Sequence, residues 1–184
     1  MTVSSSRDGF GAVARLLHWL VAALIITLLI SGELSDLLPK TVNIPFHKAL
    51  GITVLALAVV RLVWWGLDRV RPHEDGPRWQ MLAATATKLG LAAASVALPV
   101  SGWLMSSAAG KPIVLFGLAT VPPLLAPDKG LAHLFKEGHE LIANGLLALL
   151  ALHVAASLFH HFVLKDAVLE RMLPHHHPKA ADQA

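Results

Sequence analysis

The 184-residue chain contains no cysteine. This absence excludes disulfide bonds, zinc sites built on thiolates, iron–sulfur clusters on cysteine ligands and covalently attached c-type haem. Charge is also scarce, because only 15% of the residues are charged while 55% are apolar and the mean hydropathy is +0.61. Soluble domains carry about 25% charged residues. The composition therefore excludes an ordinary soluble enzyme and a disordered chain, and it predicts an integral membrane protein.

Four apolar segments are long enough to cross a bilayer, which takes about 20 predominantly apolar residues. They cover about residues 12–32, 45–67, 82–108 and 138–164. We therefore predict an all-α integral membrane four-helix bundle. It forms one transmembrane domain over residues 1–174, followed by a disordered cytoplasmic tail over residues 175–184.

A fifth apolar stretch, Pro112–Pro127, is a poor span. It contains four prolines, each of which lacks the backbone amide donor that a helix in lipid needs. We expect a surface loop here with a short interfacial helix.

Cations are distributed unequally across the predicted membrane. Ten lie on the side of the two termini, including every arginine: Arg7, Arg15, Arg61, Arg69, Arg71, Arg78, Lys88, Lys165, Arg171 and Lys179. Five lie on the opposite side: Lys40, Lys48, Lys111, Lys129 and Lys136. The positive-inside rule then predicts that both termini are cytoplasmic. Because the cations form no cluster, the pI of about 9.5 does not indicate nucleic-acid binding.

Two histidines share one face of the fourth predicted helix. His139 and His153 are 14 residues apart, which places them about 40° apart around the axis and about 21 Å apart along it. Polar side chains inside a span are costly, so their presence indicates a function. This separation suits two stacked cofactors and is far too long for one shared metal ion.

Two further histidines lie at matching depths on other helices. His18 is near the inner end of the first span and His47 at the outer end of the second, which pairs His18 with His153 and His47 with His139. Two imidazoles per site are typical of haem b, in which the porphyrin supplies four more nitrogens. We therefore predict two haem b groups, with these four histidines as axial iron ligands. The alternatives are hydrogen-bonded core histidines and zinc, but zinc needs ligands that converge on one point.

Three cations lie near the predicted ligands and suit the haem propionates. Arg15 precedes His18 by one helical turn. Arg61 follows His47 by 14 residues and returns to the same face near the inner haem. Lys48 adjoins His47 at the outer edge.

Several segments, in their order and spacing, resemble the bacterial cytochrome b561 family. They are RLLHWLVAALI, IPFHKALGITVLALAVVRL, ALPVSGWLMS, KPIVLFGLATVPPL, HELIANGLLALLALHVAASLFHHFVLKD and VLERMLP. The resemblance implies a multi-pass protein of the bacterial inner membrane with two haem b groups, and the family's ligands map onto His18, His47, His139 and His153. Such proteins pass electrons between the periplasmic face and the quinone pool. For some of them the reaction is superoxide oxidation, with ubiquinone as acceptor.

Quinone reduction needs protons as well as electrons. His160 follows His153 by seven residues, so it lies within about 20° of the same face and about 10 Å nearer the cytoplasm. We predict that His160, Lys88 and Arg61 line a quinone and proton site. The alternative is that His160 is an interfacial anchor and Lys88 reaches a headgroup or a propionate. Lys88 also stands where related sequences commonly have a histidine.

The predicted periplasmic side has no net charge, because its five lysines are balanced by Glu33, Asp36, Asp128, Glu137 and Glu140. An anionic donor such as superoxide would therefore be attracted only by a local cluster, such as Lys48 with Lys111 or Lys136.

Together these features predict a dihaem membrane cytochrome that carries electrons between a periplasmic donor, with superoxide the leading candidate, and ubiquinone. Two activities stay open: a superoxide:ubiquinone oxidoreductase and a plain electron-transfer protein. One alternative is a b-type membrane anchor that exchanges electrons with a separate periplasmic redox protein. Another, from a different class, is a haem-free transporter or assembly subunit that uses buried histidines.

Overall fold

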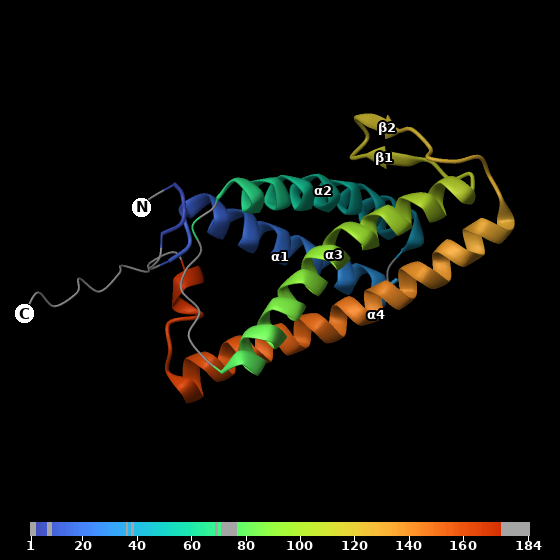
Figure 1. Cartoon of the computed structure of the whole chain (residues 1–184). Coiled ribbons are helices and arrows are strands. Elements are labelled where there is room, and N and C mark those ends of the chain that lie inside the picture. The colour runs from blue at the N-terminus through green and yellow to red at the C-terminus, as the bar shows by residue number, and fades with distance from the viewer. Residues whose placement is uncertain are drawn as a thin grey trace, which may run out of the picture.

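The computed structural model describes residues 3–6, 9–35, 37, 39–68, 70 and 77–173. Within these residues four long helices form the fold: α1 (Ala12–Glu33), α2 (Lys40–Leu67), α3 (Arg78–Ala108) and α4 (Lys129–Phe159) (Figure 1). All four are long and apolar enough to cross a membrane. The predicted all-α integral membrane bundle is therefore confirmed. The predicted tail, 175–184, lies outside the described residues, and the single domain and the side of the termini stay predictions.

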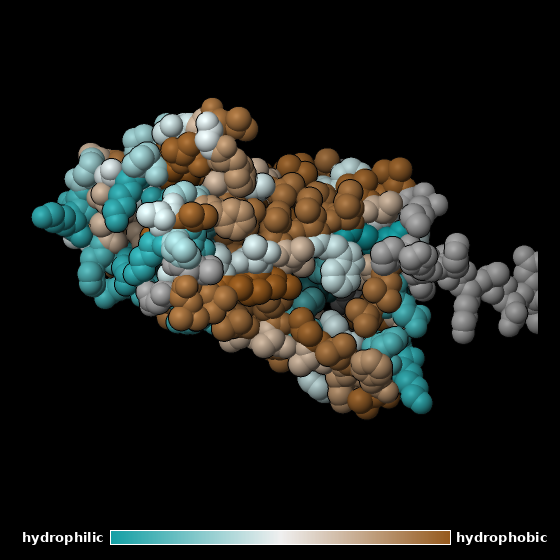
Figure 2. Space-filling model, turned by 180° about the vertical axis from the view of Figure 1, so that it is seen from behind, coloured by the Kyte–Doolittle hydropathy of each residue, from teal (hydrophilic) through white to brown (hydrophobic). Residues whose placement is uncertain are grey.

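Apolar side chains cover much of the outside of the bundle. Figure 2 shows hydrophobic residues along the length of the helices and more hydrophilic ones toward the two ends. Leu16, Leu89 and Leu141 are among the large exposed side chains, whereas a buried apolar cluster joins only Leu28, Leu50 and Val54. This distribution fits a protein whose helices face lipid, because lipid covers apolar side chains that water would not.

The helices are longer than the apolar spans predicted from the sequence. α2, α3 and α4 begin at Lys40, Arg78 and Lys129, each several residues before the predicted span. These first turns are polar, so a hydropathy pattern does not include them although the backbone is already helical.

Helices α1 and α2 form one antiparallel pair. Near one end Ser31 of α1 contacts His47 of α2, and near the other end His18 contacts Arg61. In an antiparallel pair, the residue numbers of facing residues add up to a constant value. The value is 78 for Ser31 with His47 and 79 for His18 with Arg61, so the two helices keep one register along the pair. Position along α1 therefore fixes which residues of α2 lie at the same level.

Helices α3 and α4 form a second antiparallel pair with the most extensive packing in the bundle. A β-carbon added at Gly102 would lie 3.1 Å from His139 Cε1, and one added at Gly90 would lie 3.0 Å from Leu149 Cδ1. The residue numbers of these facing residues add up to 241 for Gly102 with His139 and to 239 for Gly90 with Leu149. The two helices therefore also keep one register.

The connection between α3 and α4 contains a β-hairpin and not the expected interfacial helix, so that expectation was wrong. Strand β1 (Ile113–Leu115) pairs antiparallel with β2 (Ala119–Val121). The turn places Phe116 and Gly117 at positive φ (49° and 79°), and Leu118 N–H donates to Leu115 O at 2.8 Å. Two successive residues at positive φ match the twist of a hairpin. The flanking prolines exclude a continuous helix, and the β-branched residues between them favour strands.

The chain beyond α4 folds back onto the start of α1. A π-helical turn, η1 (His160–Leu164), ends at Lys165 in the left-handed conformation (φ 53°), and a short 3₁₀ helix, η2 (Glu170–Met172), follows. Trp19 Nε1 donates to Met172 O and Arg15 Nη1 donates to Leu173 O, both at 2.8 Å. The segment after α4 thus closes the end of the bundle that holds His18.

The N-terminus of α4 provides a test of the fold. Asp128 caps this helix by accepting from Leu131 N–H at 2.9 Å. Asp128→Ala is expected to destabilise the protein by about 1 kcal/mol, because the amide loses its acceptor. Thermal unfolding in detergent measures this loss. Asp128→Asn keeps a side-chain acceptor and is the matched control. Equal stability of the Ala variant and the wild type would contradict the capping role.

Candidate functional site

Two pairs of histidines face one another inside the bundle. The ring centroids of His18 (α1) and His153 (α4) are 6.3 Å apart, and those of His47 (α2) and His139 (α4) are 6.4 Å apart. These are the two pairs that helix spacing and depth predict. The His47/His139 pair lies toward the end of the bundle that carries the hairpin, and the His18/His153 pair toward the end that carries η2.

The separation within each pair fits one metal ion between two imidazoles. With metal–nitrogen bonds of about 2.0–2.1 Å and roughly 1.1 Å from each nitrogen to its ring centre, the two centroids would be about 6.2–6.4 Å apart. Within the described residues no group of three or more His, Cys, Asp or Glu side chains converges on one point. Each pair therefore offers two imidazoles and no third side chain of these types, a set that fits an iron porphyrin with four nitrogens of its own.

Hydrogen bonds determine which nitrogen of His47 is available. Its Nδ1 lies 2.7 Å from Ser31 Oγ, and the Ser31 hydroxyl donates its own proton to Leu28 O at 2.9 Å. Ser31 Oγ must therefore accept, so His47 carries its ring proton on Nδ1. A neutral imidazole has only one ring proton, which leaves the Nε2 lone pair of His47 for a metal.

His139 is held in the same way by α3. Its Nδ1 lies 3.0 Å from Ser101 Oγ and 3.1 Å from Leu98 O, and Ser101 donates to that same carbonyl at 2.8 Å. A carbonyl oxygen can only accept, so His139 also carries its proton on Nδ1 and presents Nε2. The absence of a side chain at Gly102 allows this ring to approach the helix closely.

A Ser-Gly dipeptide therefore supports each histidine of the hairpin-end pair. In Ser31-Gly32 and Ser101-Gly102 the serine accepts from Nδ1, and the glycine lies beside Cε1 of the same ring. Neither dipeptide was predicted from the sequence. The signal available was a polar serine followed by glycine within two otherwise apolar spans, one on each helix that precedes a ligand helix.

The His18/His153 pair has a guanidinium nearby, whereas the His47/His139 pair has serine hydroxyls. Arg61 Nη2 lies 3.2 Å from His18 Nδ1, and the guanidinium is within electrostatic reach of His153 as well. Arg61 therefore lies at the His18/His153 pair itself. Within the described residues no serine hydroxyl accepts from either ring.

Trp64 adds an unsatisfied donor one turn beyond Arg61. Its Nε1 is buried and has no hydrogen-bond partner within the described residues. Buried donors of this kind are rare and usually have a partner of some kind. A carboxylate or carbonyl oxygen of a bound group would satisfy it.

Arg15 and Lys48, predicted near the propionates, both bond to backbone oxygens. Arg15 is buried and donates to Leu173 O, which leaves further guanidinium donors. Lys48 Nζ donates to Pro112 O at 3.4 Å and lies within electrostatic reach of Lys111. Lys136, in contrast, pairs with Glu140 at 2.7 Å. Of the local cation clusters considered from the sequence, the structure thus brings together Lys48 and Lys111.

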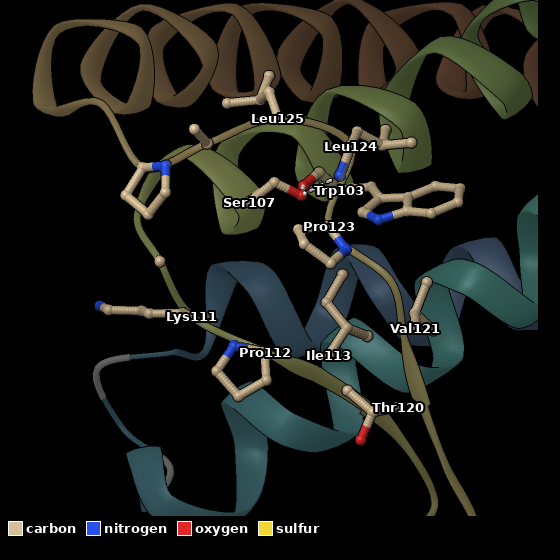
Figure 3. A pocket seen from close by; sticks show the side chains of 13 residues that line it. Trp103, Ser107, Lys111, Pro112, Ile113, Thr120, Val121, Pro123, Leu124 and Leu125 are labelled. Carbon is tan, nitrogen blue, oxygen red and sulfur yellow. Dashed lines mark hydrogen bonds between the residues drawn. The ribbon is translucent and has the colours of Figure 1, made fainter.

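A cavity of about 450 Å³ lies between the end of α3 and the hairpin (Figure 3). Its lining is mainly apolar and includes Trp103, Ile113 and Val121. Two of the polar side chains in it are already bonded: Trp103 Nε1 donates to Pro122 O, and Ser107 Oγ accepts from Leu124 N–H. Lys111 points away from the cavity in Figure 3, so its charge is directed elsewhere.

His160 has a partner that the sequence analysis did not name. Its Nδ1 bonds to Asp166 Oδ2 at 2.5 Å, across the π-helical turn. Burial raises the pKa of Asp166, but the hydrogen bonds from His160 and Val168 N–H outweigh this, so the pKa lies below its usual value. The carboxylate is therefore ionised at neutral pH and orients the His160 ring. The turn that creates this contact leaves no mark in a hydropathy pattern.

Lys88 lies at a different level from His160. The register of α3 and α4 places Lys88 beside Ala151, about 13 Å along α4 from His160 and close to the level of His153. Its side chain is on an exposed part of α3. The predicted residues thus lie at two levels, with Arg61 and Lys88 near His153 and His160 nearer the end of α4.

Known proteins are similar in sequence to this chain over nearly all of its length. The family model for prokaryotic cytochrome b561 matches residues 9–175. Cytochrome b561 homolog 2 of Escherichia coli (strain K12) is 32% identical over 183 residues, which cover 94% of this chain and 95% of the relative. Probable superoxide oxidase CybB of Yersinia pestis is 31% identical over 163 residues, covering 86% and 92%. The chain therefore belongs to the prokaryotic cytochrome b561 family of bacterial membrane proteins, which carry b-type haem and transfer electrons.

Proposed function

We propose that this protein holds two haem b groups and carries electrons across the bacterial inner membrane to ubiquinone, with superoxide as the donor. The observation that carries the proposal is the presence of two imidazole pairs, with centroids 6.3 and 6.4 Å apart, at two levels of one bundle. His18 and His153 would hold one haem, and His47 and His139 the other. Each bound haem would supply a one-electron iron couple.

The polypeptide contributes ligand orientation and position. Ser31 and Ser101 hold their histidines with Nε2 available, and α4 separates His139 from His153 by about 21 Å along its axis. The two sites therefore lie at different depths in the bilayer. The excess of arginine and lysine at the termini supports a cytoplasmic position for the His18/His153 pair and a periplasmic one for the hairpin.

Two features support superoxide as the donor. One similar protein is named a probable superoxide oxidase. In addition, Lys48 adjoins His47 and lies within electrostatic reach of Lys111, which concentrates positive charge at the hairpin end. In the balanced reaction, two superoxide anions each lose one electron and leave as O₂. One ubiquinone takes up these two electrons and two protons to become ubiquinol.

The proposed proton route to ubiquinone lies at the end of α4. The imidazole of His160 is a side chain of the kind that serves as a general acid or base, and Asp166 holds its ring in one orientation. Arg61 and Lys88 lie deeper, near the level of His153, and place positive charge where an anionic reduced quinone would form. This arrangement extends the predicted site of His160, Lys88 and Arg61 by Asp166.

Replacing each proposed ligand tests the haem assignment. Single replacements by alanine are each expected to retain one haem where the wild type retains two, because each removes one of the two imidazoles that would hold a haem: His18→Ala, His47→Ala, His139→Ala and His153→Ala. Haem content and the reduced absorption spectrum of detergent-purified protein measure this. His133→Ala, on an exposed histidine paired with Glu137, is the control and should retain both haems. A colourless folded wild type would support a haem-free transporter or assembly subunit instead.

The role of the lysines is tested by neutralising them. Lys48→Gln combined with Lys111→Gln is expected to slow haem reduction by superoxide about tenfold at low salt, and to weaken its dependence on ionic strength. Stopped-flow spectroscopy measures both the rate and its dependence on ionic strength. Lys165→Gln, which follows η1 and lies far from the hairpin, is the matched control. Unchanged rates would exclude steering by this pair. A wild type that superoxide does not reduce would favour a separate periplasmic redox partner as donor.

The proton route is tested at His160. His160→Ala is expected to keep both haems but lose about 100-fold in quinone turnover, the usual scale for a lost acid–base group. Asp166→Asn should lose less, because it removes only the carboxylate that orients the His160 ring. His161→Ala is the neighbouring control. Quinone turnover that is unaffected in His160→Ala would refute this role and leave His160 as an interfacial anchor.

A further inference from the structure

The two histidine pairs differ in what surrounds their second ring nitrogens. At the hairpin end, both Nδ1–H groups donate to neutral oxygens, those of Ser31, Ser101 and Leu98. At the other end, the nearest group to His18 Nδ1 is the guanidinium of Arg61, which can only donate. The two sites therefore offer iron ligands of different electron-donating strength.

An acceptor on Nδ1–H makes an imidazole a stronger donor. When the ring proton is shared with an oxygen, electron density at Nε2 rises, which stabilises the more positive ferric iron. His139 has two such acceptors, Ser101 Oγ at 3.0 Å and Leu98 O at 3.1 Å, and His47 has Ser31 Oγ at 2.7 Å. Hydrogen bonding at the hairpin end therefore lowers the reduction potential of a haem held by His47 and His139.

A buried cation has the opposite effect. The Arg61 guanidinium lies 3.2 Å from His18 Nδ1 and within electrostatic reach of His153. When the His18 ring is neutral and bound through Nε2, its proton is on Nδ1, so Arg61 cannot donate there but remains as a nearby positive charge. That charge favours the ferrous over the ferric iron. Arg61 therefore raises the reduction potential of the His18/His153 site.

The charges near the hairpin-end pair do not cancel this difference. Lys48 adjoins His47, but its side chain is half-buried and its ammonium reaches Pro112 O of the loop before the hairpin, at 3.4 Å. Glu140 is within electrostatic reach of His139 and adds a negative charge, although it is paired with Lys136. Neither group is as close to a ligand ring as Arg61 is to His18.

We propose that Ser31 and Ser101 lower the haem potential at the His47/His139 pair and that Arg61 raises it at the His18/His153 pair. Electrons then run downhill from the hairpin end to the end of the bundle that carries η2. This inference rests on the proposed dihaem function and deepens it by naming the residues that set the order of the two haem potentials. Ser31, Ser101 and Arg61 act as positioning residues, since each acts through a ligand histidine.

Spectroelectrochemical titration of the purified dihaem protein tests the order of the potentials. The sites are assigned with single-haem proteins: His47→Ala leaves the His18/His153 haem, and His153→Ala leaves the other. The remaining haem in His47→Ala is expected to titrate at the higher potential. The reverse order, with one haem in each variant, would overturn the inference. A wild type that binds fewer than two haems would instead contradict the proposed function, so the two failures are distinguishable.

The individual residues are tested on the same titration. Ser31→Ala is expected to raise the lower potential, and Ser31→Thr, which keeps the hydroxyl, should restore it. Ser101→Ala should have a smaller effect, because His139 retains Leu98 O as acceptor. Arg61→Gln should lower the upper potential and Arg61→Lys should not. If Arg61→Gln fails to bind haem, the serine variants still decide the matter. Unshifted potentials in Ser31→Ala with both haems present would mean that the serine only orients the ring.

Discussion

The candidate sites depend on where each imidazole places its single ring proton. A histidine can present Nε2 to a metal in its neutral form only when Nδ1 keeps the proton, and within an apolar bundle that proton needs an acceptor. Ser31 provides it for His47, and Ser101 with Leu98 provides it for His139. Each of these acceptors is on the helix that precedes the ligand helix, so the antiparallel pairing of α1 with α2 and of α3 with α4 prepares the two ligands.

The two antiparallel helix pairs, α1/α2 and α3/α4, thus support one histidine each in the same way. In each antiparallel pair the earlier helix carries a Ser-Gly dipeptide, and the later helix carries the histidine that this dipeptide supports. The repetition stops at the other end. There the α1/α2 pair has Arg61 beside His18, whereas the register of the α3/α4 pair brings Lys88 near the level of His153. The two ends of one bundle therefore surround similar ligands with different charge.

The amino-acid sequence predicts a large part of this arrangement. The apolar lengths predict four helices, and the 14-residue interval between His139 and His153 predicts two levels on one helix. Hydropathy and spacing are properties of single segments, so they can be read without knowing the partners. The serine acceptors, the proximity of Arg61 to His18 and the pairing of His160 with Asp166 depend on register between helices or on a π-helical turn. Neither the register between helices nor a π-helical turn produces a periodic pattern in the sequence. The hairpin between α3 and α4 was also not predictable, because its segment is recognised in the sequence only as apolar and rich in proline.

The fourth helix supplies one histidine to each pair, and this has a consequence for biogenesis. Of the four candidate histidines, the first three helices carry only His18 and His47. The antiparallel packing of α1 and α2 places these two at opposite ends of the bundle. Neither histidine pair is complete until α4, which carries His139 and His153, has been inserted. If the pairs hold haem as proposed, haem insertion follows the assembly of all four helices. The carbonyls of Met172 and Leu173, which bond to Trp19 and Arg15, then close the end beside His18.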